Sequence, residues 1–214
     1  MIGNRWTLGI LFLFCLSIFS LQGCATLNSS VPFKYVPSLT VAEPNEIHLG
    51  MERLVDKRPS DDRTATESVS DVDDKVTSTL LSDFRTSRIF ASADYPPRQD
   101  RDNLIMKGEI KRFYWKYSPS PIIFIPFLGC LIYLGIPAGE AEGIAEISVQ
   151  MINAKTGAMV AEYNRKDEKK ASYTIYNFKV GEAGSELADA FREVSKQIKD
   201  SILSDMKAGR FKIP

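Results

Sequence analysis

Residues Ser185–Lys207 read SELADAFREVSKQIKDSILSDMK, and this stretch decides the fold class. Its apolar residues recur at helical spacing, which predicts one amphipathic helix with a single buried stripe. Ser185 suits the N-cap position, Glu186 suits the positive end of the helix dipole, and Gly209 ends the helix. The stripe consists of Leu187, Phe191, Val194, Ile198, Ile202 and Met206. Such a helix needs an apolar face of a sheet or of other helices to cover.

The residues before this helix predict strands. Residues 144–152 and 158–163 flank a turn at 153–157, where Gly157 supplies the positive φ that a tight turn favours. The residues that follow, up to Tyr176, form either a continuation of the same strand or a second one.

Residues 103–117 (NLIMKGEIKRFYWKY) predict a long strand whose buried face changes parity. The first half carries its apolar residues at even positions, whereas Phe113, Trp115 and Tyr117 occupy odd ones. Because side chains alternate across a strand, a bulge or bend near Lys111 must change the face.

Two earlier segments complete the domain. Residues 74–86 have helical apolar spacing after a possible cap at Asp73 or Asp74, and residues 46–55 alternate like a strand that ends before Pro59. This order predicts an α+β fold. We expect a largely antiparallel sheet of about four to five strands with two helices packed on one face. An apolar hairpin insert is expected at residues 119–139.

The insert contains the stretch PIIFIPFLGCLIYLGI (121–136), which carries no charge. Three interpretations stay open: it dips into a membrane or contacts another subunit, it folds into the protein's own core, or it spans a bilayer. A span is disfavoured because about 20 apolar residues are needed and Pro126 and Gly129 weaken a helix. Nearby aromatic residues favour a membrane–water boundary. The expected contact residues are Ile123, Phe124, Phe127, Leu128, Leu131 and Tyr133.

The N-terminus has the pattern of a secretory signal. Residues 1–5 are short and basic, residues 6–19 are almost wholly apolar, and small residues precede Cys24. Leu21-Gln22-Gly23-Cys24 resembles the lipobox of bacterial lipoproteins. This resemblance implies cleavage before Cys24 and acylation of its thiol and new amine.

Acylation at Cys24 would anchor the chain durably, because each buried methylene contributes roughly 0.8 kcal/mol and two or more chains hold firmly. Residues 1–23 are then the signal peptide, 24–45 a flexible tether, and 46–214 a single periplasmic domain. Ala25 follows the cysteine, and in this family the absence of Asp there favours the periplasmic face of the outer membrane.

The order of elements from Ile47 to Met206 also resembles YajG-like, transport-auxiliary and curli-secretion lipoproteins, and the ring-forming lipoprotein of Pel export. The short motifs that carry this resemblance are DKRP (56–59), RIF (88–90), NLIMKGEI (103–110) and KTG (155–157). It implies a domain that assembles with other envelope proteins and performs no chemistry. The insert at 119–139 departs from the simplest members.

Residues for catalysis or metal binding are sparse. The single histidine, His48, lies on the expected outer side of a strand, and no Gly-x-Ser-x-Gly motif accompanies it. Cys130 alone remains as a thiol after Cys15 leaves and Cys24 is acylated, so no internal disulfide forms. Asp56 and Arg58 suggest a structural pair. We therefore expect no catalytic residues, metal or cofactor.

Equal numbers of basic and acidic residues, 27 of each, give no basic excess for nucleic acid. The sequence thus favours a non-enzymatic lipoprotein that is an accessory or assembly subunit of an envelope complex. Its expected partners are the membrane, through acylated Cys24, and other envelope proteins or further copies of itself. Two alternatives are a subunit of an oligomeric outer-membrane secretion channel and a lipid-binding carrier.

Overall fold

The computed structural model describes residues 45–64, 71–98, 100–125, 127–177 and 184–211. The signal, Cys24 and all of the expected tether except Asn45 lie outside these residues. The elements in chain order are β1 (His48–Met51), β2 (Val55–Asp56), α2 (Ser60–Thr64), α3 (Val72–Ser87), β3 (Ser92–Asp94), β4 (Leu104–Pro119), β5 (Gly139–Asn153), β6 (Met159–Tyr173) and α4 (Ser185–Lys207). The strands form a mixed sheet in the order β3-β1-β4-β5-β6, with β2 also paired to β4.

The long strands β4, β5 and β6 form an antiparallel unit. Leu104 pairs with Asn153 and Pro119 with Gly139, so β4 and β5 stay paired along their whole length. The register shifts between Ile110 and Arg112, which confirms the bulge predicted from the change in parity. β6 is one continuous strand, which settles the question left open for residues 158–176.

The expectation of a largely antiparallel sheet is met by β4, β5 and β6, whereas the expected count of four to five strands needs correction, as does the direction of the short strands. The sheet has six strands, and β1 pairs in parallel with both β3 and β4, as β2 does with β4. The physical reason is the helix α3 between them, because a chain that crosses over through a helix re-enters the sheet in the same direction.

The two predicted helix starts also differ. Gly184, with φ 86°, is the N-cap of α4 in place of Ser185. Asp71, with φ 52°, caps α3 in place of Asp73 or Asp74, and its side chain makes no capping hydrogen bond. Both cap residues adopt the left-handed conformation, which apolar periodicity does not reveal.

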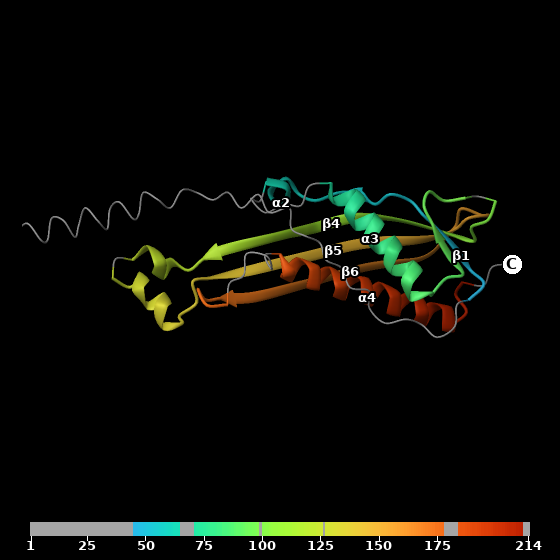
Figure 1. Cartoon of the computed structure of the whole chain (residues 1–214). Coiled ribbons are helices and arrows are strands. Elements are labelled where there is room, and N and C mark those ends of the chain that lie inside the picture. The colour runs from blue at the N-terminus through green and yellow to red at the C-terminus, as the bar shows by residue number, and fades with distance from the viewer. Residues whose placement is uncertain (1–44, 65–70, 99, 126, 178–183, 212–214) are drawn as a thin grey trace, which may run out of the picture.

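Helices α3 and α4 cover the same face of the sheet, as Figure 1 shows. The predicted stripe of α4 is buried at Leu187, Phe191, Val194, Ile198 and Ile202, and Met206 packs at its margin. On the sheet, buried side chains alternate along β4 and β5 and include Ile110, Phe113, Trp115, Ile147 and Val149. These residues form one continuous core.

The opposite sheet face carries charged rows. Glu142 in β5 lies between Lys116 of β4 and Lys170 of β6, and Glu146 lies likewise between Arg112 and Lys166. Opposite charges directly across strands stabilise a sheet by roughly 0.2–1 kcal/mol for each pair. Each central carboxylate is therefore flanked by cations.

A buried ion pair joins the two long helices. Lys199 of α4, 3% exposed, donates from Nζ to Asp83 Oδ1 of α3 at 2.8 Å. Ser195 Oγ also donates to Asp83, whose side chain is fully buried. The pair fixes how α3 and α4 pack, because each buried charge needs its partner.

Replacing Lys199 by Met should lower the free energy of unfolding by about 3–5 kcal/mol, because Asp83 would remain as an uncompensated buried charge. Urea denaturation followed by circular dichroism measures this. The double variant D83L/K199M is the control and should lose much less. An equal loss in both variants would show that the helix packing, and not the stranded charge, causes the effect.

Candidate functional site

A protruding segment joins the ends of β4 and β5. Between Pro119 and Gly139 the chain forms two short 3-10 helices, η1 (Pro121–Phe124) and η2 (Gly129–Leu134). Figure 1 shows them at the left end of the long strands, past the ends of α3 and α4. The insert is therefore built from short helices and not from the expected hairpin strands. Residues 122–125 and 127–136, with Ile175 and Tyr176, are called the apolar tip below.

The side chains of the apolar tip are unusually exposed. Neither η1 nor η2 contains a buried residue. Phe127 is 92% exposed, Leu134 79%, Phe124 72% and Tyr133 67%. Isolated exposed apolar residues are common, but a contiguous group of this kind indicates a contact surface.

The six residues predicted as contacts therefore come together at one end of the molecule. Phe124, Phe127, Leu128 and Tyr133 are exposed, and Ile123 and Leu131 are half-buried. The alternative that this segment folds into the protein's own core is wrong, because none of its described residues reaches the core. A search of the described residues finds no helix with the length and apolar character needed to cross a membrane.

Sequence reasoning missed the contribution that the turn after β6 makes to the tip. Tyr176, 69% exposed, donates its hydroxyl to the backbone oxygen of Tyr133. Ile175 beside it is also exposed, at 38%. The uncharged run Ala171–Asn177 was a possible signal, but only the pairing of Tyr173 with Gly139 shows that it ends beside the insert.

The backbone of the tip is paired internally. Ala138 N donates to Tyr173 O at 2.7 Å, and Ser120 N donates to Ala138 O at 2.8 Å, which closes the base of the loop. Further amides within the segment donate to carbonyls three or four residues earlier, namely those of Ile123, Ile125, Leu128, Gly129, Leu131 and Gly135. The amide hydrogens at these positions are therefore satisfied within the segment.

The start of α4 supports the base of the tip. The buried Glu186 accepts a hydrogen bond from Trp115 Nε1 at 2.9 Å and another from the Tyr173 hydroxyl. A Cβ at Gly143 would overlap the backbone of Glu186 and Leu187, so the helix lies directly on β5 there. Burial also raises the pKa of Tyr117, near the end of β4.

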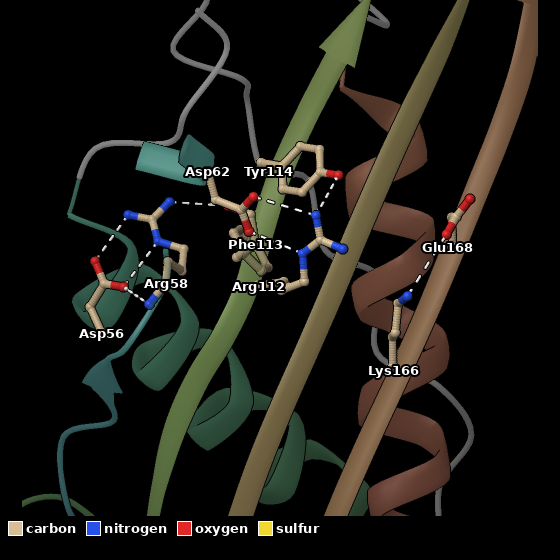
Figure 2. A network of polar contacts seen from close by, with 8 residues as sticks. All are labelled: Asp56, Arg58, Asp62, Arg112, Phe113, Tyr114, Lys166 and Glu168. Atoms are coloured by element: carbon tan, nitrogen blue, oxygen red, sulfur yellow. Dashed lines mark hydrogen bonds and ion pairs between the residues drawn. The ribbon is translucent and has the colours of Figure 1, made fainter. Parts of the chain in front are cut away.

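Figure 2 shows the polar network on the edge of β4. Arg58 donates to both oxygens of Asp56 at 3.1 Å and to Phe113 O at 3.0 Å, so the predicted Asp56–Arg58 pair is structural. Arg112 donates to Asp62 of α2 at 3.1 Å. That hydrogen bond raises the pKa of Arg112, against the opposing effect of burial. These charges neutralise one another.

Other possible reactive groups are dispersed. His48 Nδ1 lies 2.8 Å from Ser92 Oγ, which lies 3.3 Å from Asp94 Oδ2, so the carboxylate contacts the serine, whereas a catalytic triad places it against the imidazole. The described part of the chain holds no group of three or more possible metal ligands. Cys130 is exposed on η2 and donates to Phe127 O. Between β6 and α4 lies a hollow of about 490 Å³ lined mainly by polar residues, including Tyr163, Arg165, Asp205 and Arg210.

Comparison with known proteins finds only distant structural similarity. No family profile and no curated protein matches the sequence. A Xanthomonas campestris protein of the DUF330 family is 12% identical, with a TM-score of 0.47 over 80% of this chain and 91% of that chain. Uncharacterized lipoprotein B from Nitrosomonas europaea is 12% identical, with a TM-score of 0.47 over 82% and 94%. The PelC dodecamer from Paraburkholderia phytofirmans is 11% identical, with a TM-score of 0.40 over 73% and 92%. These values assign neither a family nor a function to the chain.

Replacing Phe124 and Leu128 together by Asp should leave the free energy of unfolding within about 0.5 kcal/mol of the wild type, because both side chains are outside the core. Thermal and urea denaturation test this. The matched control is Asp at Ile147, which is fully buried and should prevent stable folding. Loss of the native state in the F124D/L128D variant would show that this segment contributes to the core after all.

Proposed function

We propose that this chain is a non-enzymatic, membrane-anchored lipoprotein whose domain acts as an accessory or assembly subunit of a cell-envelope complex. Acylated Cys24 would hold it at the periplasmic face of the outer membrane. The observation that carries the proposal is a well-packed domain that presents one uncharged, exposed apolar tip.

The arrangement of charges supports binding and not catalysis. The described ionisable groups form short pairs such as Asp56–Arg58, Asp62–Arg112 and Asp83–Lys199. Catalytic groups usually converge in a concave pocket with strongly shifted pKa values. Here the polar residues stabilise the edge of β4 and the contact between helices.

The tip supplies the surface through which such a subunit would act. Burying apolar side chains is favoured by a free energy of roughly 25 cal/mol for each Å² removed from water. The side chains that a partner could cover here are those of Phe124, Phe127, Tyr133 and Leu134. Because the tip extends past the helices, it can be covered without rearranging the core.

The anchor can be tested by growing expressing cells with labelled palmitate. We expect label in the wild type, and we expect C24S to lack the label and to leave the membrane fraction. A C24S variant that still carries palmitate and sediments with membranes would contradict the proposal.

The assembly role needs a separate measurement. Photo-cross-linking from position 133 in intact cells should trap a partner in the envelope, and the same probe at Lys196 of α4, on the exposed side of the helix, is the control. Equal products from both positions would show that the tip is not the contact surface. A closed ring in native mass measurements would instead favour the secretion-channel alternative.

A further inference from the structure

The apolar tip is exposed on several sides and not along one face. Tyr133 and Leu134 are consecutive residues of η2, yet they are 67% and 79% exposed. Successive residues of a 3-10 helix point about 120° apart. Phe127, between the two short helices, is 92% exposed. A flat protein surface would cover one side of such a protrusion, whereas the acyl chains of a bilayer would surround it.

The chemistry of the tip suits a lipid environment. No charged residue occurs between Lys116 and Glu140. The amides of Ile125, Leu128 and Leu131 donate within the segment, and Pro121 and Pro137 have no amide hydrogen to satisfy. This pairing matters because an unsatisfied backbone group costs several kcal/mol in hydrocarbon.

The size of the tip limits the depth that it can reach. At a rise of about 2 Å for each residue, η1 and η2 extend roughly 8 and 12 Å. The hydrocarbon core of a bilayer is about 30 Å thick, so the tip can enter only one leaflet. Tyr133 and Tyr176, joined through a hydroxyl–carbonyl hydrogen bond, are the side chains suited to the membrane–water boundary.

The tip and the chain that leads to the lipid attachment site lie at opposite ends of the domain. Asn45 Nδ2 contacts Met206 Sδ near the end of α4, whereas the tip lies beyond the start of that helix. The length of β4 separates these ends by roughly 50 Å. The chain from Cys24 to Asn45 can extend to at most about 70 Å, so both ends can reach one membrane.

We propose that the apolar tip is a second, non-covalent anchor, which inserts into the leaflet that holds the acyl chains of Cys24. The domain is then held at one membrane both through the tip and through the chain that leads to Cys24. This inference rests on the proposed lipid anchor and names a phospholipid bilayer as the partner of the tip.

The test uses the mature acylated protein with Phe127→Trp, added to preformed vesicles of phosphatidylethanolamine and phosphatidylglycerol. Emission of this Trp should shift to shorter wavelength and lose about half its intensity when the lipid acyl chains carry bromine, because the side chain enters hydrocarbon. Unsubstituted protein gives the background from Trp115, which is 1% exposed. Lys196→Trp, on the exposed side of α4, should not respond.

Each outcome decides one part of the proposal. Protein that sediments with vesicles but is not quenched at position 127 overturns the insertion and leaves the lipid anchor intact. Protein that does not sediment overturns the anchor itself. Adding F124D/L128D should abolish the quenching while sedimentation persists, and unchanged quenching would overturn the role of the tip. In a second arrangement, the protein is first bound to unbrominated vesicles and brominated vesicles are added afterwards. Quenching that appears only after this addition would overturn insertion into the bilayer that holds the acyl chains of Cys24.

Discussion

The packing of α4 along the long antiparallel strands is the interaction on which the rest of the structure depends. Six of its apolar residues are buried without exposed surface, and its first turn lies directly on Gly143 of β5. Because β4, β5 and β6 are held by this helix, their ends can project past the helices and still keep a defined position. The exposed segment between β4 and β5 is therefore carried by a stiff support.

The sequence predicted the elements whose periodicity is long and regular. The bounds of α4 agree with the apolar stripe of 185–207, and the parity change in 103–117 located the bulge. Parallel pairing of β1, β2 and β3 was missed because these strands have only two to four residues. Such short segments carry too little pattern to indicate direction.

The candidate site was predicted in part, for a physical reason. The lack of charged residues identified 119–139 as a distinct segment. A buried segment would lack charge in the same way, so the sequence alone did not predict that this one is exposed. Exposure depends on what packs nearby, and helices α3 and α4 end short of this region. The contribution of Tyr176 depends on the register of β5 and β6, which brings Tyr173 beside Gly139.

The register shift between Ile110 and Arg112 makes the buried face of β4 depend on the number of residues at this position. Phe113 and Trp115 lie in the core only because one additional residue is accommodated there. Since side chains alternate strictly, deletion of Lys111 would remove the bulge and keep the aromatic residues on the core side, whereas insertion of one further residue there would turn the aromatic half of the strand to the opposite face. Arg112 and Tyr114 would then face the helices. Natural insertions should therefore be tolerated in the protruding loop and rejected within these few positions.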